Sequence, residues 1–251
     1  MRHRGKSHIN FQKIPLLPDV TSWKDVEIQE CGERVVSLNE LYSDRIIVKP
    51  QYFLQEIKDS LKECFVREAV AKMLIKASQS LPSNYEFVIW DAWRPIETQK
   101  ALFNSYKDKL NASNPTLSED ELGKLIQKYV SLPSLDKTCP PPHSTGGAVD
   151  LSIGEQDGNY LDMGTTYDDF SNRASTRYFE EKIEKGENLS SNEMVVINNR
   201  RLLFNILTEV GFTNYPDEWW HYDYGNQFWA KAKGVNAIYG RVDLKDLDKG
   251  I

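Results

Sequence analysis

The hydrophobic positions of this chain form helical stripes and short alternating runs. Between residues 52 and 80, apolar side chains recur at spacings of three and four, which predicts one long helix. A second stripe covers residues 195–210. The segment Ser190-Ser-Asn-Glu193 before it has the form of a capping box, and Gly211 is placed to end the helix. The pattern therefore predicts one helix in each of these two regions.

Two shorter helices and several strands are expected between and around these stripes. Pro95 is well placed to begin a helix that runs to about Leu110, and Ser118-Glu-Asp-Glu121 is a capping-box signature for another that runs to about Val130. Short runs rich in β-branched and aromatic residues predict the strands. These segments are Ile46–Val48, Tyr85–Trp90, Ala148–Ile153 and parts of Phe212–Tyr224, where Pro216 interrupts the pattern.

This order of elements predicts an α+β fold. We expect a single compact domain with a central antiparallel sheet flanked by helices. Residues 1–50 have scattered apolar positions and turn residues, so we expect an irregular N-terminal segment packed on the domain formed by residues 51–251.

Composition narrows the function classes. The chain has 251 residues, of which 40% are hydrophobic and 27% charged, as in ordinary globular proteins. A formal charge of −6 without a basic block argues against nucleic-acid binding. No apolar run approaches the roughly 18 residues of a membrane span, and the start of the chain lacks a convincing signal peptide. We therefore expect a cytoplasmic protein with no membrane partner, and the sequence predicts no particular oligomeric state.

The three cysteines fit the same compartment. Cys31, Cys64 and Cys139 are widely spaced and form no Cys-x-x-Cys pair, a pattern typical of reduced thiols. Cys139 lies four residues before a candidate metal ligand, His143, but we interpret it as a loop or core cysteine because a ligand set exists without it.

Two histidine-containing segments supply the inventory of a metal site. The first runs from His143 through a Gly-Gly pair to Asp150, and the second places Glu218 three residues before His221. A catalytic zinc site needs three protein ligands, an open position for water and a base for the water's proton. If Val149 and its alternating neighbours face the core, Asp150 faces an open cleft. The two segments together predict a metal-dependent hydrolase.

Each of these residues also has an ordinary structural explanation. Asp150 could be a surface aspartate beside a loop histidine, and His221, next to two tryptophans, could be a core histidine bonded to a carbonyl. Arg94 follows the strand that ends at Trp90, where it could stabilise an anionic tetrahedral intermediate. A local salt bridge between Arg94 and Asp91 is the equally weighted alternative.

Four motifs, in this order, resemble those of the zinc D-alanyl-D-alanine dipeptidases across residues 84–230. They are Asp91-Ala-Trp-Arg-Pro95, His143-Ser-Thr-Gly-Gly-Ala-Val-Asp150, Met163-Gly-Thr-Thr-Tyr-Asp168 and Glu218-Trp-Trp-His221. The resemblance implies a compact α+β zinc peptidase domain, in agreement with the pattern of elements. It also implies one Zn²⁺ per chain, with His143, Asp150 and His221 as its ligands.

The same resemblance implies roles for three more residues. Glu218 would be the catalytic base, Arg94 would stabilise the transition state, and Asp168 would meet the free amino group of the substrate. The chain departs from the family at Pro141 and Pro142, where serines of the family help to form the substrate pocket. Hydrolysis and zinc binding are unaffected by that departure, but the preferred dipeptide is not predicted.

Three functions are compared. The first is a zinc dipeptidase acting on D-alanyl-D-alanine or a similar small dipeptide, and Asp168 and the expected cytoplasmic location favour it. The second is a related zinc D,D-carboxypeptidase or cell-wall peptidase with a longer substrate. The third is a non-catalytic metal-binding or ligand-sensing protein, which would not need the base Glu218. Iron oxygenases also use two histidines and a carboxylate, but their His-x-Asp spacing is absent here.

Overall fold

The computed structural model describes residues 11–41, 43–127, 132–169 and 171–243, together with residues 245 and 247. Its strands are β1 (Val35–Ser37), β2 (Ile46–Val48), β3 (Phe65–Arg67), β4 (Tyr85–Asp91), β5 (Ala148–Glu155), β6 (Thr213–Asn214) and β7 (His221–Asp223). Its α-helices are α1 (Gln51–Leu54), α2 (Glu68–Ser78), α3 (Ile96–Ser113), α4 (Glu119–Gln127), α5 (Tyr178–Glu184), α6 (Ser191–Val210) and α7 (Gln227–Lys233).

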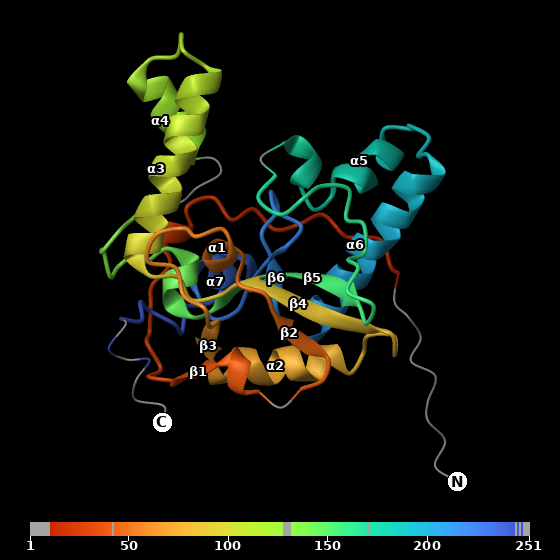
Figure 1. The fold of residues 1–251 in the computed structure, drawn as a ribbon, viewed down its shortest axis with the longest axis horizontal. Helices are drawn as coiled ribbons and strands as arrows, with labels where there is room; N and C mark the ends of the chain where they lie inside the picture. The colour runs from red at the N-terminus through yellow and green to blue at the C-terminus, as the bar shows by residue number, and fades with distance from the viewer. Residues whose placement is uncertain are drawn as a thin grey trace.

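A five-stranded sheet with the order β2-β4-β5-β7-β6 forms the centre of the molecule (Figure 1). All of its pairings are antiparallel except the one between β2 and β4, which is parallel. A separate two-stranded sheet pairs β1 with β3. The predicted α+β class and the single compact domain are confirmed, with a central sheet that is mostly antiparallel rather than wholly so.

One face of the central sheet packs in the hydrophobic core, and the opposite face carries Asp150. On β5, Val149, Leu151 and Ile153 are fully buried in the main hydrophobic core, as their alternation predicted. Helices α2 and α6 contact each other and pack over this face, where their leucines and valines join the same core (Figure 1). Asp150, between Val149 and Leu151, belongs to the opposite face because successive side chains of a strand alternate.

The predicted single helix over residues 52–80 is wrong. The chain forms α1, then an irregular stretch with positive φ at Glu56 (58°) and Asp59 (59°), then β3, and only then α2. Left-handed backbone at two non-glycine residues ends any continuous helix. Strand β3 pairs with β1, which was not predicted, some thirty residues earlier in the chain. Local periodicity cannot detect such a distant partner.

The other predicted elements agree closely with the structure. Pro95 is the residue before the first turn of α3, and the capping box of Ser190 and Glu193 begins α6, which ends at the left-handed Gly211. Ser118 and Glu121 exchange the hydrogen bonds expected of a capping box before α4. The described part of α4 ends at Gln127, so its predicted end near Val130 lies outside the described residues. Figure 1 shows α3 and α4 extending away from the central sheet.

The N-terminal segment runs over the domain and is bonded to it at several points. Backbone hydrogen bonds join Gln29 to Ala237 and Cys31 to Ile238. The buried Arg67 forms a bidentate ion pair with Glu30 and donates to the carbonyl of Thr145, which links this segment to the histidine loop. In the described part of the chain, the helices are too short or too polar to cross a membrane.

Candidate functional site

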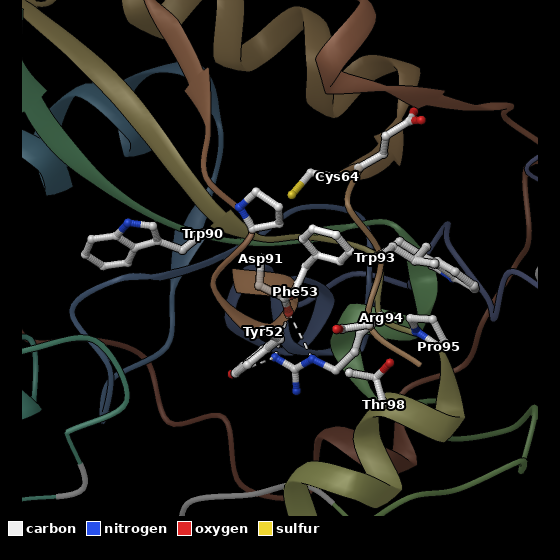
Figure 2. A pocket seen from close by; sticks show the side chains of 13 residues that line it. Tyr52, Phe53, Cys64, Trp90, Asp91, Trp93, Arg94, Pro95 and Thr98 are labelled. Atoms are coloured by element: carbon white, nitrogen blue, oxygen red, sulfur yellow. Dashed lines mark hydrogen bonds and ion pairs between the residues drawn. The ribbon is translucent and has the colours of Figure 1, made fainter. Parts of the chain in front are cut away.

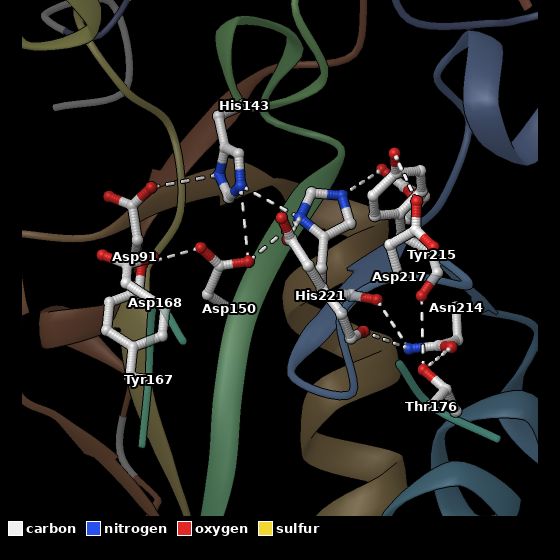
Figure 3. A network of polar contacts seen from close by, with 12 residues as sticks. Asp91, His143, Asp150, Tyr167, Asp168, Thr176, Asn214, Tyr215, Asp217 and His221 are labelled. Atoms are coloured by element: carbon white, nitrogen blue, oxygen red, sulfur yellow. Dashed lines mark hydrogen bonds and ion pairs between the residues drawn. The ribbon is translucent and has the colours of Figure 1, made fainter. Parts of the chain in front are cut away.

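His143, Asp150 and His221 come together in one buried cluster. The Nε2 atom of His143 lies 3.2 Å from Nδ1 of His221 and 3.4 Å from Oδ1 of Asp150, and the same Nδ1 and Oδ1 atoms are 3.0 Å apart. All three side chains are less than a tenth exposed, and Figure 3 shows them converging from different segments. The structure thus brings together the three side chains that the sequence offered as metal ligands.

The spacing of the three donor atoms suits a small metal ion. Zinc binds histidine nitrogen and carboxylate oxygen at about 2.0–2.2 Å with tetrahedral geometry, so adjacent donor atoms lie about 3.4 Å apart. The observed separations of 3.0, 3.2 and 3.4 Å are close to that edge length. Three protein donors also leave one tetrahedral position for water or substrate. The cluster can therefore hold a metal in the arrangement of a catalytic site.

The local sequence explains how His143 reaches the cluster. A short 3₁₀ helix, η3 (Pro142–Thr145), carries the histidine and begins at Pro141 and Pro142, which are both buried. Gly146 ends η3 in the left-handed region at φ 72°, and a Cβ atom on Gly147 would lie 2.3 Å from the carbonyl oxygen of Tyr224. Both glycines are therefore needed for the sharp entry into β5.

The outer nitrogen of each histidine has an oxygen partner that fixes the ring. His143 Nδ1 lies 2.7 Å from the carbonyl oxygen of Ala92 and 3.2 Å from Oδ2 of Asp91, and His221 Nε2 lies 3.0 Å from Oδ1 of Asp223. Protons on these outer nitrogens leave the inner nitrogens free to bind a metal. Asn226 donates to Asp223 at 2.6 Å.

Sequence reasoning missed the role of Asp223, although a signal was present. Asp223 follows His221 by two residues on β7, so both side chains share one face of the strand. A carboxylate at that spacing can support the histidine from behind, as outer partners of metal ligands commonly do.

Charge also favours a cation at the cluster. Burial lowers the pKa of His221, but the carboxylates of Asp223 and Asp150 outweigh it and hold that pKa well above its usual range. Burial raises the pKa of Asp150, yet the two histidines bring it well below its usual range. Without metal, a proton on His221 therefore provides positive charge between two carboxylates, and a divalent ion can replace it.

Glu218 lies beside the cluster without belonging to it. Its Oε2 atom is 3.9 Å from Nδ1 of His221, and its side chain is one-fifth exposed. Two successive turns, closed by the hydrogen bonds Glu218 N to Tyr215 O and His221 N to Glu218 O, bring both side chains to the same side. The predicted interruption of the strand near Pro216 is confirmed, and β7 begins only at His221. Burial raises the pKa of Glu218 to about 8, as do Asp150 and Asp168, whereas His221 lowers it.

Arg94 occupies the other side of the site. It also forms the salt bridge to Asp91 that the sequence offered as the alternative to a catalytic role. Its Nε and Nη2 atoms donate to Oδ2 of Asp91 at 2.9 and 2.7 Å, and Nη2 lies 3.8 Å from Oδ2 of Asp150. Figure 2 shows this pair beside Tyr52, and all three residues line a small cavity of about 10 Å³. The β4–β5 register shifts at Trp90, which places Asp91 opposite Asp150. The salt bridge thus orients Arg94 within the site.

Asp168 is a carboxylate at the edge of the same site. Burial raises its pKa to about 7, as does Asp150, whereas Arg94 and a hydrogen bond from Tyr52 lower it. Its backbone is left-handed, at φ 56°, a conformation that aspartate tolerates better than most residues. In Figure 3, Asp168 and Tyr215 lie on opposite sides of the histidine cluster. A cation beside Asp168 would stabilise its charged form.

An open cavity lies beyond Tyr215. Its volume is about 770 Å³, and its walls are residues 17–25 of the N-terminal segment, Tyr215, Pro216, Asp217 and Phe228. The ring of Tyr215 lies 5.9 Å from that of His221 and 5.2 Å from that of Phe228. Residues 17–25 therefore reach the surroundings of the site.

The cysteines take no part in the cluster. Cys31 is exposed, Cys64 is buried, and the sulfur of Cys139 lies 3.4 Å from a carboxylate oxygen of Asp136. All three are free thiols, as the sequence predicted.

This site has the composition of a metal-dependent hydrolase. Two buried histidines and an aspartate surround one point, a glutamate lies beside them, and an arginine lies opposite. Comparison with known proteins makes the assignment more specific. The family model of the peptidase family M15, described as D-ala-D-ala dipeptidase, matches residues 48–239. The chain belongs to this family, and it is an enzyme of the metallopeptidase class.

Relatives and a solved structure were also compared. A D-alanyl-D-alanine dipeptidase of Synechocystis is 29% identical over 238 residues, which is 87% of this chain and 95% of the relative. A D-alanyl-D-alanine dipeptidase of Escherichia coli is 27% identical over 157 residues, covering 62% of this chain and 64% of the relative. The solved vancomycin-resistance D,D-pentapeptidase VanY, in complex with Zn(II), matches with a TM-score of 0.41 and 14% identity, over 70% of this chain and 83% of VanY. That structural likeness is too weak to carry an inference.

Proposed function

We propose that this protein is a zinc-dependent dipeptidase that hydrolyses a short dipeptide, most simply D-alanyl-D-alanine. The observation that carries the proposal is the buried His143–Asp150–His221 cluster, whose donor atoms are 3.0–3.4 Å apart. The Oε2 atom of Glu218 lies 3.9 Å from Nδ1 of His221. The D-alanyl-D-alanine dipeptidases among its relatives support the substrate class. In this proposal residues 51–251 form the zinc peptidase domain, to which the preceding segment contributes strands β1 and β2.

The metal ligands and Glu218 would have different roles in activating water. Zinc, when bound, would act as a Lewis acid and lower the pKa of a coordinated water. His143, Asp150 and His221 would hold it, while Asp223 and the carbonyl of Ala92 orient the two rings. Glu218 stands near the cluster without filling a ligand position, so its carboxylate can accept the proton of the attacking water.

Arg94 and Asp168 would act on the substrate from the other side. The guanidinium of Arg94, fixed by Asp91, can stabilise the negative charge that develops on the oxygen of the scissile carbonyl. The carboxylate of Asp168 can pair with the free ammonium group of a dipeptide. A substrate with its ammonium on Asp168 and its first peptide carbonyl at the cluster would be cut after one residue.

We predict one tightly bound zinc per chain. His143→Ala and His221→Ala should each abolish stoichiometric zinc while leaving most secondary structure, because each removes a donor. Asp223→Asn should keep the site but weaken zinc binding by about 10–100-fold, the usual effect of losing an outer partner of a ligand. Elemental analysis and chelator competition at fixed pH measure both effects. Unchanged zinc content in both histidine variants contradicts the ligand assignment.

The proposed substrate is tested by blocking its amino group. A charged hydrogen bond between the ammonium and Asp168 contributes about 1.5–3 kcal/mol, and acetylation also leaves the carboxylate desolvated without a cation. We expect free D-alanyl-D-alanine to be cleaved about 100-fold more efficiently than its N-acetylated form, measured as kcat/KM with zinc present. Asp168→Ala should reduce this preference by slowing cleavage of the free dipeptide. Equal cleavage of both substrates by the unmodified protein contradicts the dipeptidase proposal.

The second candidate is a zinc D,D-carboxypeptidase or cell-wall peptidase, which would use the same metal cluster on a longer substrate. Such a peptide would extend past Asp168, on the side of the cluster away from the cavity beside Tyr215, so the length of the preferred substrate distinguishes the two candidates. Tripeptides and longer D-alanyl-D-alanine peptides belong in the same assay. Faster cleavage of these than of the free dipeptide would favour the second candidate.

A further inference from the structure

Tyr52 contacts more of the candidate site than its place in the chain suggests. It lies on the four-residue helix α1, in the stretch where the sequence predicted one long helix, and its side chain is buried with 6% exposure. Its hydroxyl and its ring make separate contacts with functional groups of the site. Among these groups are Asp168 and Arg94, which the proposed function places on the substrate, and Figure 2 shows Tyr52 beside Arg94.

The hydroxyl of Tyr52 lies among three polar partners. It is 3.0 Å from the hydroxyl of Tyr167, 3.3 Å from Oδ1 of Asp168 and 3.4 Å from Nη2 of Arg94. Tyr167 in turn lies 2.8 Å from Oδ2 of Asp150. These contacts join the amino-group site, the transition-state arginine and a metal ligand in one network.

The protons of the two phenols limit which residue donates and which accepts in each of these hydrogen bonds. Each phenol has one proton, and a charged carboxylate or guanidinium can take only one role, acceptor or donor. If Tyr167 gives its proton to Asp150 across the shorter contact, the proton of Tyr52 can go to the oxygen of Tyr167 or to Asp168, and the charged carboxylate is the stronger acceptor of the two. The oxygen of Tyr52 can at the same time accept from Arg94. Such a donated bond favours the ionised form of Asp168 and orients its carboxylate toward an ammonium group.

The ring of Tyr52 makes a separate contact, with the guanidinium of Arg94. The guanidinium carbon of Arg94 lies 4.8 Å from the ring centroid, within the range of a cation–π contact. Asp91 fixes the same guanidinium from one edge, and Gln99 accepts from Nη1 at 2.7 Å. The ring therefore supports the face of Arg94 while the polar partners hold its edges.

We propose that Tyr52 is a positioning residue for substrate recognition, with its hydroxyl acting on Asp168 and its ring acting on Arg94. The proposal rests on the dipeptidase function proposed above and adds a determinant of selectivity for the free amino group. It separates two effects of one side chain, because a phenylalanine removes the hydroxyl, with its bond to Asp168 and its longer contact to Arg94, and retains the ring.

The test compares Tyr52→Phe with Tyr52→Leu on free and N-acetylated dipeptide. Tyr52→Phe should lower kcat/KM for the free dipeptide about 10-fold, as expected for one hydrogen bond to a charged group, and change that for the acetylated form less than about 2-fold. Tyr52→Leu should lower kcat for both substrates by a further factor of about 5–10, because Arg94 loses the ring. Tyr178→Phe on α5, where the ring packs against Phe179, is the matched control and should leave both values unchanged.

The ratio of the two kcat/KM values separates positioning from folding. Both substrates meet the same fraction of folded, zinc-loaded protein, so a loss of fold or metal cancels in the ratio. If Tyr52→Phe leaves that ratio unchanged, the assignment of its hydroxyl to Asp168 is overturned.

A second measurement does not need the acetylated substrate. In an Asp168→Ala background, Tyr52→Phe should have almost no further effect on the free dipeptide, since the partner of the hydroxyl is gone. A full 10-fold loss in that background would also overturn the proposal. Failure of the unmodified protein to cleave any dipeptide would instead contradict the proposed function, so the two failures are distinguishable.

Discussion

Glu218→Gln is expected to reduce kcat on the free dipeptide by about 10³-fold while one zinc per chain is retained. A positioned general base contributes about 10²–10⁴-fold to such a reaction, and glutamine cannot accept the proton of the attacking water. Zinc should remain because Glu218 is not one of the three residues whose donor atoms converge, and its Oε2 atom is 3.9 Å from Nδ1 of His221. Glutamine also keeps the shape of the side chain, so the loss reports chemistry rather than packing.

The pKa of Glu218 supplies a control for that experiment. Because burial raises the pKa of Glu218 to about 8 in the absence of metal, its ionisation at neutral pH works against folding. A carboxyl whose pKa is higher in the folded state gives a stability that falls as pH rises from its unfolded value, near 4.3, through about 8. Metal-free Glu218→Gln should therefore be as stable as the unmodified protein below about pH 4 and more stable at pH 8, measured as Tm. Loss of zinc in this variant would make Glu218 a ligand, and undiminished kcat would remove it as the base.

Most of the fold could be predicted from local patterns, and the failure has a specific cause. Helix α6 has both a capping box and a terminal glycine, and β5 has strict alternation, so local signals alone define them. The region 55–67 has the apolar spacing of a helix but contains two left-handed residues and a strand whose partner is β1. Tertiary pairing overrides helical periodicity there, and a single sequence does not show it.

The candidate site was predictable where its chemistry lies within short motifs. His143 and Asp150 are joined by a glycine pair, and Glu218 and His221 by a three-residue spacing, so their types and order indicate the site. Asp223 also had a local signal, the two-residue spacing on β7. Tyr52 had none, because its contacts with Asp168 and Tyr167 span more than a hundred residues. Residues that act through such distant contacts become apparent only in three dimensions.

Arg94→Ala is expected to lower kcat on the free dipeptide by about 10²–10³-fold with a much smaller change in KM. Removing one preorganised donor to a developing oxyanion typically costs this much, and the cost falls on kcat when the contact is made mainly in the transition state. Arg94→Lys keeps the positive charge but loses the planar fork that holds Oδ2 of Asp91, so we expect an intermediate loss. Arg34→Ala, at an exposed ion pair with Glu68, is the matched control and should leave kcat unchanged.

The same substitution must be checked for its effect on the metal, since Asp91 lies between Arg94 and His143. Its Oδ2 atom accepts from Arg94 at 2.7 Å and lies 3.2 Å from Nδ1 of His143. Removal of the guanidinium leaves a buried carboxylate without its ion pair, which is expected to lower the Tm. If zinc content in Arg94→Ala stays at one per chain and kcat alone falls, Arg94 acts on the transition state. A change confined to KM would assign Arg94 to ground-state binding. A fall in activity that follows the loss of zinc would instead make its role the positioning of His143 through Asp91.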